Sequence, residues 1–252
     1  MNVLLTLLAG IVLGAVVAQF ATFLTTVYLH RTLSHRSITM RPGLAFAFRF
    51  LLWVTVGIRA REWVAVHRKH HAFTDVEGDP HSPKLLGWVT VQLGNVGLYR
   101  KVATDPAQVA RYARDLPPDR WDRVLFDRAW LGLGLGIGLV VLAFGPWIGL
   151  LAAGVHTAMY LQLNSAVNAV THTFGKRPYD NGATNLQWLA LITMGEGLHN
   201  NHHAAPTSAK LALRGHEIDP AWPAISMLRR VRLLRIRHDV LKLKVRQPSP
   251  VG

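Results

Sequence analysis

Histidines are the residues of this chain whose type and spacing point most clearly to chemistry. The 252-residue sequence contains 13 of them, and eight fall into three clusters that each follow a hydrophobic segment. In the second and third clusters, one histidine precedes the others by three and four residues, so on a helix the three share a face. Three imidazoles on one face can converge on one site, and neutral imidazole suits zinc, copper, iron and nickel. The clusters are His30 with His35; His67, His70 and His71; and His199, His202 and His203.

The first cluster has a different spacing. His30 and His35 are five residues apart, and on an ideal α-helix they point roughly 140° from each other. A regular helix therefore cannot bring both to one ion. Either the helix changes its pitch there, or the two histidines serve different ions.

A further candidate pair follows the last long apolar segment. Asn168 and His172 are four residues apart and share a face if the segment is helical. The histidine could bind metal while the amide holds a metal-bound water. The spacing alone does not distinguish this arrangement from an ordinary polar helix end.

Five segments, in this order, resemble the membrane fatty acyl desaturases, the stearoyl-type enzymes that act on acyl-CoA or lipid-linked chains. They are His30–Arg36, Glu62–His71, Asp79–His81, Asn168–Asp180 and Gly195–His203. The resemblance implies a centre of two iron ions (Fe2+/Fe3+), with dioxygen as co-substrate and Asn168 supporting a metal-bound water. It implies no catalytic residue beyond the metal centre. By position, the implied metal ligands are His30, His35, His67, His70, His71, His172, His199, His202 and His203.

This resemblance predicts an oxygen-dependent oxidoreductase that introduces a double bond into a saturated acyl chain. A hydroxylase or a terminal-alkene-forming oxidase of the same superfamily is the enzymatic alternative. Metal transport or storage is the non-enzymatic one, and it predicts ionisable residues inside membrane spans. Only His156 fits that expectation.

The expected partners follow from what the sequence lacks and from its charge. The chain has no cysteine and no flavin, nicotinamide or haem motif, so electrons must come from a separate donor, a ferredoxin or a reductase. Its net charge of +14 suits an anionic membrane surface or a phosphorylated substrate, and no nucleic-acid partner is expected. Arg68, Arg100 and Lys101 resemble positions that meet a phosphorylated head group, with a solvated basic surface as the alternative reading.

The elements that must position these residues are indicated by the distribution of charge. Residues 1–29 and 129–170 contain no Asp, Glu, Lys or Arg, as a bilayer requires of its spans. We expect a single all-α membrane domain over 1–252, with spans at about 3–29, 129–144 and 147–170. Animal members of the resembling family have two spans before the first histidine cluster, and this chain has room for one. The blocks 30–128 and 171–252 are rich in basic residues, which predicts that they are cytoplasmic, on the inner or plasma membrane of the cell.

Three further segments carry expectations. Leu44–Ile58 is apolar but interrupted by Arg49, which favours an interfacial helix, and Pro223–Arg246 reads as a basic helix lying on the membrane. Gly132, Gly134, Gly136 and Gly138 form two overlapping small-xxx-small pairs, typical of close helix packing. His216 and His238 lie outside the resembling segments and are expected at the surface.

Overall fold

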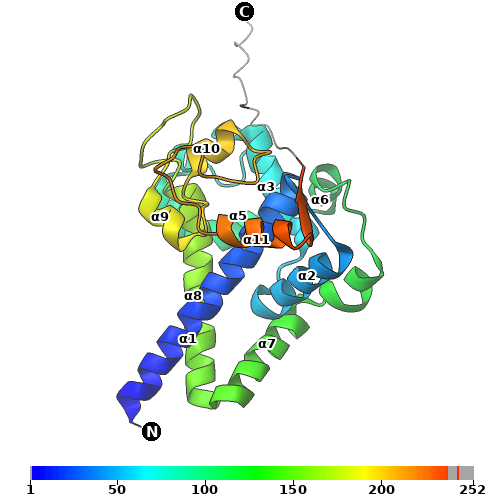
Figure 1. Ribbon diagram of the computed structural model, residues 1–252, viewed down its shortest axis with the longest axis vertical. Helices are drawn as coiled ribbons and strands as arrows, with labels where there is room; N and C mark the ends of the chain where they lie inside the picture. The colour runs from blue at the N-terminus through cyan, green and yellow to red at the C-terminus, as the bar shows by residue number, and fades with distance from the viewer. Residues whose placement is uncertain (1, 238–242, 244–252) are drawn as a thin grey trace, which may run out of the picture.

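Three long helices form one half of the molecule. The computed structural model describes residues 2–237 and residue 243. Helix α1 spans Val3–Leu24 and continues as a π-helix, η1, over Thr25–Ser34. Helices α7 (Ala129–Phe144) and α8 (Pro146–Ala169) form a hairpin that turns at Gly145. These helices project together from a cap built of the remaining elements (Figure 1).

Small residues allow the three long helices to pack closely. A Cβ atom at Gly14 would lie 2.6 Å from the carbonyl oxygen of Ala152, so α1 and α8 touch backbone to backbone there. Of the two glycine pairs on α7, only one lies at a close helix contact. Gly132 and Gly136 pack against helix α2 (Pro42–Val56), whereas a Cβ atom at Gly134 or Gly138 would meet no other atom within 4 Å. Only the first pair therefore supports helix packing within the chain.

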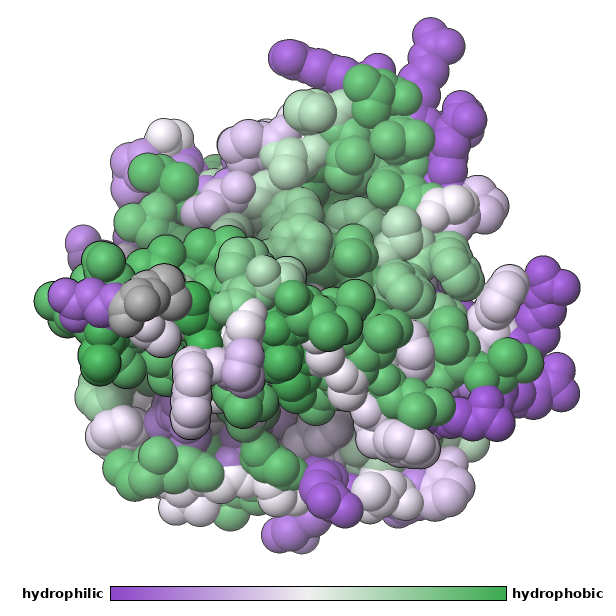
Figure 2. Space-filling view, turned by 90° about the horizontal axis from the view of Figure 1, so that it is seen from below, coloured by the Kyte–Doolittle hydropathy of each residue, from purple (hydrophilic) through white to green (hydrophobic). Residues whose placement is uncertain are grey.

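The long helices present apolar surface to their surroundings. Leu142 and Trp147, on either side of the hairpin turn, are 84% and 80% exposed. The face from which the helices project is largely hydrophobic (Figure 2). An aqueous environment would penalise so much apolar area. The arrangement suits helices that lie in a membrane.

Helix length and hydropathy identify fewer candidate membrane spans than the three predicted from the distribution of charged residues. Among the described residues, one continuous helix, Val3–Ser34, is long and apolar enough to cross a membrane, and a second follows if the bent pair α2–α3 is counted as one span. Helix α7 has only 16 residues, and the second half of α8 carries polar residues such as Gln162 and Asn164. Helices α7 and α8 lie at the positions expected for two of the apolar segments, and the expected end of the first, at residue 29, falls within η1. That all three segments cross a membrane stays a prediction.

Helices α2 and α3 form the next layer. α2 ends at Gly57, whose left-handed φ of 63° stops the helix, and α3 (Ala60–Phe73) leaves at 89° to it. The ring of His156 on α8 donates from Nε2 to the carbonyl oxygen of Thr55, 2.8 Å away. This bond satisfies one of the carbonyls that every helix end leaves open. His156 is a packed, hydrogen-bonded residue within the hairpin.

The remaining helices belong to the cap, and all but the 16-residue α5 are short. They are α4 (Pro83–Leu86), α5 (Trp88–Ala103), α6 (Pro106–Tyr112), the short π-helix η2 (Asp122–Phe126), α9 (Gln187–Ile192), α10 (His199–Ala204) and α11 (Trp222–Arg230). α5 packs against α8, and α3 packs against both α5 and α6. Arg49 of α2, expected to interrupt an apolar segment, pairs with Asp119 and Asp122.

The fold is not purely helical, which corrects the all-α expectation. Strand β1 (Ile38–Met40) pairs antiparallel with β2 (Leu234–Ile236), Thr39 facing Arg235. The basic helix expected from residue 223 accordingly ends at Arg230. A strand follows because Leu234 is buried against the core while Arg235 faces out, an alternation that suits a strand better than a helix. His238 and most of the residues beyond it lie outside the described part of the chain.

Candidate metal centre

The π-helix decides how the first two histidines lie. The amide of His35 donates to the carbonyl of His30 at 3.1 Å, a bond that spans five residues rather than four. Residues five apart therefore lie nearer the same face than they would on an α-helix. The rings of His30 and His35 lie 4.8 Å apart between centroids. Of the two alternatives left open by the sequence, the change of pitch is the one that occurs.

The two triple clusters lie on α3 and α10. Helix α10 is only six residues long, and buried amides hold it in place. Asn200 bonds to the backbone of Tyr179 and Ala183, and Asn201 bonds to Glu217 and to the carbonyl of Leu211. These asparagines fix the three histidines around them, a role that the sequence pattern did not indicate.

All nine candidate ligands gather into two groups. Within each group the candidate ligand atoms lie within 4.8 Å of one another. Each triple cluster divides between the groups: the residues at i and i+4 stay together, and the one at i+3 joins the other group. One group comprises His30, His35, His67, His71 and His202; the other comprises His70, His172, His199 and His203. We call them the five-histidine and four-histidine groups.

The ring atoms that converge are the same in all nine residues, and they suit a metal. Eight Nε2 atoms lie 2.7–3.4 Å from the Nε2 atom of another histidine. The ninth, of His172, is buried without a hydrogen-bond partner among the described residues. Two neutral imidazoles can share one proton, and a cation between the rings would satisfy the many nitrogens that face one another. The donor set fits transition metal ions bound through Nε2.

Burial favours the neutral form of six of these rings. It lowers the pKa of six of the histidines well below the ordinary value, and their histidine neighbours lower it further. A metal binds the neutral form of imidazole, so the site is prepared for metal rather than for protons. The six are His35, His67, His71, His199, His202 and His203.

Three carboxylates hold the opposite ring nitrogen of three ligands. Glu196 accepts from Nδ1 of His30 at 2.7 Å, Asp79 from His70 at 3.0 Å, and Asp75 from His172 at 2.9 Å. A carboxylate on Nδ1 leaves Nε2 as the metal-binding atom and fixes the ring. The segments that resemble the desaturases contain Asp79 and Glu196, but the sequence alone gave these carboxylates no role. Their position beside histidines in the same segments was the available signal.

A cavity of about 80 Å³ opens onto the histidines. Its walls come from α1, η1, α3, α5 and α8, and it reaches His30, His67 and His199. Half-buried Asn168 lines it. Its support of a metal-bound water stays a prediction. The other wall residues include Thr22, Thr25, Thr26, Asn95, Tyr99, Asn164 and Thr193.

His81 also borders this cavity but belongs to neither group. It lies behind His70, with 4.8 Å between the ring centroids, and forms a separate cluster with His70 and Asp79. Burial lowers the pKa of His81 to about 3. The structure thus places His81 beside the four-histidine group rather than within it.

Comparison with known proteins agrees with this geometry. Residues 4–230 match the family model described as fatty acid desaturase. The chain belongs to the fatty acid desaturase family. The family is one of oxidoreductases that act on fatty acyl chains.

Several curated desaturases are similar over most of this chain. An sn-1 stearoyl-lipid 9-desaturase of Synechocystis is 30% identical, over 85% of this chain and 66% of its own length. An sn-2 palmitoyl-lipid 9-desaturase of Nostoc is 32% identical, over 82% and 73%. An acyl-CoA C20 Delta5-desaturase of Anemone leveillei is 31% identical, over 92% and 75%. The chain spans about two thirds to three quarters of the length of these relatives.

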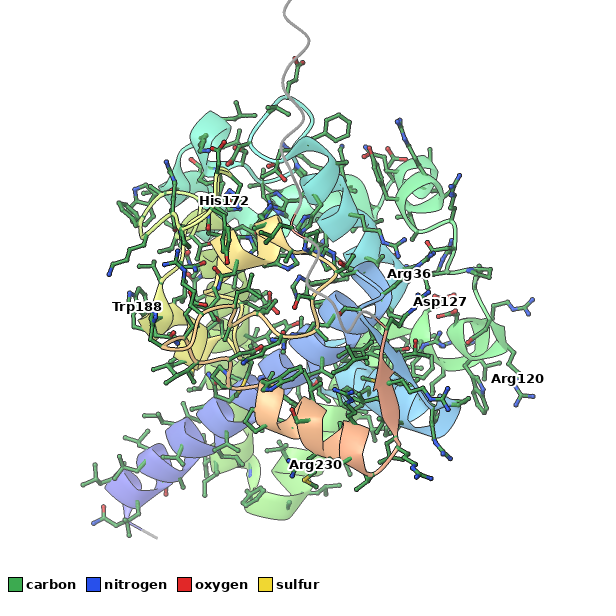
Figure 3. All side chains as sticks on the ribbon, turned by 45° about the horizontal axis from the view of Figure 1, so that its top comes forward. Arg36, Arg120, Asp127, His172, Trp188 and Arg230 are labelled. Carbon is green, nitrogen blue, oxygen red and sulfur yellow. The ribbon has the colours of Figure 1, made fainter. Side chains whose placement is uncertain are left out.

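The basic residues considered for the desaturase head-group site differ in their surroundings. Arg68 donates all five of its N–H groups, to Asp115 and to the carbonyls of Leu33, Ser34 and Tyr112. No donor of Arg68 is left for a ligand in this conformation. Arg100 and Lys101, at the end of α5, are exposed. In Figure 3, His172 lies inside the cap, whereas Arg120 and Arg230 lie at the surface and point outward.

Proposed function

We propose that this protein is an oxygen-dependent fatty acyl desaturase that holds two iron ions, one in each histidine group. The convergence of nine Nε2 atoms into two neighbouring groups is the observation that carries the proposal. An unactivated methylene has no acidic proton, so acid–base catalysis cannot remove its hydrogens. Iron bound in these groups would supply, with dioxygen, the oxidant that this reaction requires.

The chain's own residues would bind the metal ions, orient a metal-bound water and enclose the acyl chain. The nine histidines would hold the metals through Nε2, and Asn168 would hold a metal-bound water at the cavity wall. The acyl chain would lie in the cavity between α1, α3, α5 and α8, which Thr22, Trp63 and Val167 line. Packing of these helices would keep bulk water from the reacting carbons.

The proposed topology has three spans within a single domain over 1–252. α1 with η1, α7 and α8 would cross the bilayer, and residues 30–128 and 171–252 would lie in the cytoplasm of the cell, as the excess of basic residues favours. A reporter fused at residue 1 should then be extracytoplasmic, and one fused near residue 110 cytoplasmic. A cytoplasmic N-terminus would contradict this topology.

The proposed substrate is a lipid-linked saturated acyl chain, with a ferredoxin or a reductase as the electron donor. Two of the relatives described above are named as acyl-lipid 9-desaturases, and Arg68 is fully engaged within the protein. α5, which lines the cavity on one face, exposes apolar Val89, Leu93 and Val96 on another. A substrate that enters from the lipid would meet this helix first. Acyl-CoA, as in the Anemone relative, is the alternative, and it would meet Arg100 and Lys101.

Gas chromatography with mass spectrometry of lipids tests the proposal. Cells that express the protein should gain monounsaturated acyl chains, and cells that express His67→Ala at equal membrane abundance should not. Hydroxylated chains or terminal alkenes in place of unsaturated ones would favour the alternative oxidases. Metal accumulation without any change in lipids would favour transport or storage.

A further inference from the structure

Buried carboxylates are distributed unequally behind the histidine groups. In the four-histidine group, two of the four rings, His70 and His172, donate from Nδ1 to Asp79 and Asp75. In the five-histidine group, only His30 does so, to Glu196. Nδ1 of His199 and of His202 is buried without any partner among the described residues.

The carboxylates are themselves held firmly. The side chain of Asp79 is fully buried and accepts from the backbone amides of Asp75 and His81. Asp75 accepts from the hydroxyl of Ser82 and pairs with Lys84, whose side chain is 42% exposed. Each carboxylate therefore has a fixed position from which it orients one imidazole.

The third carboxylate serves a different ring from a different element. Glu196 precedes α10 and reaches back to His30 and to the hydroxyl of Thr26 on the π-helix. The guanidinium of Arg31 donates to both carboxylate oxygens of Asp219. Glu196 thus has no cation of its own among the described residues that would compete with His30.

We propose that Asp75 and Asp79 are positioning residues for one metal position, in the four-histidine group, and that Glu196 is the positioning residue for the other. This inference rests on the proposed metal centre. It assigns each of the three carboxylates to one of the two metal positions. A carboxylate on Nδ1 raises the basicity of the ligand and fixes its direction, and its removal commonly costs about ten- to a hundredfold in metal affinity. Each substitution should therefore weaken one metal position and spare the other.

Zinc is the probe for the test because it binds imidazole, has no redox chemistry and needs neither oxygen nor an electron donor. Purified protein is loaded with Zn2+, and its release to a chelator is followed over time. Wild-type protein should hold two ions per chain. Asp79→Asn, Asp75→Asn and Glu196→Gln should each release one ion about ten- to a hundredfold faster, while the second leaves at the wild-type rate.

Double variants assign the residues to positions. Asp75→Asn with Asp79→Asn should still retain one slowly released ion, because both changes affect the same position. Asp79→Asn with Glu196→Gln should retain none. Asp115→Asn is the matched control: it removes a carboxylate that binds Arg36 and Arg68 and touches no histidine, and it should release zinc as wild type does. A misfolded variant would release both ions together. The single variants and the Asp75/Asp79 double variant should instead keep one slowly released ion, which separates a loss of positioning from a loss of structure.

The outcomes distinguish two failures. Loss of both ions from the Asp75/Asp79 pair, or retention of one by the Asp79/Glu196 pair, would overturn the division of the carboxylates while leaving the metal centre in place. Fewer than two zinc ions on the folded wild-type protein would overturn the metal centre, and this inference with it. Neither result depends on whether the protein desaturates fatty acids.

Discussion

Arg31 donates two hydrogen bonds to Asp219, at 2.8 Å to Oδ2 and 3.0 Å to Oδ1, although 188 residues separate them in sequence. Both side chains are buried. Arg31 also binds the carbonyls of Met194 and Ala209. The residue next to His30 is thereby joined to the turn that carries Glu196 and to the C-terminal part of the cap.

Breaking this pair should destabilise the protein strongly. Asp219→Asn leaves the buried charge of Arg31 without compensation, and such changes cost about 3–5 kcal/mol. We expect a markedly lower melting temperature in detergent, measured by tryptophan fluorescence. A melting temperature equal to that of the wild type would show that the pair contributes no net stability.

Alanine substitutions should separate ligands from bystanders. His199→Ala removes a buried candidate ligand and should abolish desaturation while membrane insertion persists. His216 is exposed and belongs to neither histidine group, so His216→Ala should retain most activity. The measurement is unsaturated product per unit of inserted protein. Full activity of His199→Ala would remove that residue from the ligand set.

Asn168→Ala should have an intermediate effect. It removes support for a water rather than a bond between metal and protein, so a loss of about ten- to a hundredfold is expected. Iron content should stay at the wild-type level. Loss of iron together with activity would instead make Asn168 part of what holds the metal.

Arg68→Ala should act on stability rather than on substrate binding. Its hydrogen bonds to Asp115 and to three carbonyls would be lost, and a single bond to a charged group contributes about 1.5–3 kcal/mol. The melting temperature should fall, whereas Arg100→Ala, at an exposed site, should leave it unchanged. An unchanged melting temperature with a raised apparent KM in Arg68→Ala would support the head-group role.

The glycines of α7 offer a matched pair. A Cβ atom at Gly136 would clash with the carbonyl oxygen of Val54, whereas Gly134 has open space. Gly136→Ala should force α7 away from α2 and reduce the yield of folded protein in membranes. Gly134→Ala should be tolerated or mildly stabilising, because alanine favours helix more than glycine does. Equal yields of the two variants would contradict the close packing of α7 on α2.

Acid should remove the contribution of Asp115. Its hydrogen bond with Arg68, together with Arg36, holds the pKa of its carboxyl below the ordinary value. Because the folded pKa is lowered, the stabilisation is fully present above the unfolded value of about 3.9 and is lost as pH falls below it. The difference in melting temperature between wild type and Asp115→Asn should therefore be constant near neutrality and shrink below about pH 4. A difference that persists unchanged into stronger acid would exclude an electrostatic origin.

The sequence by itself indicated the candidate ligands and the main helices around them. The spacing of His67, His70 and His71 predicted a helix, and the uncharged segments mark the positions of α1, α7 and α8. The helix is confirmed, but it turns His70 toward a different group from His67 and His71. These features could be read because they depend on periodicity and composition, which are local properties of the chain.

Only the tertiary structure decided how the ligands divide. Successive residues on a helix turn by about 100°, so His70 and His71, adjacent in sequence, face different groups. Which group each one faces depends on where α10 and η1 are packed, and that packing is fixed by contacts such as Arg31 with Asp219 between residues far apart in the chain. The contacts of the three carboxylates and the pairing of β1 with β2 also depend on the tertiary structure. The periodicity of a sequence does not indicate which distant residue a side chain will contact in the folded protein.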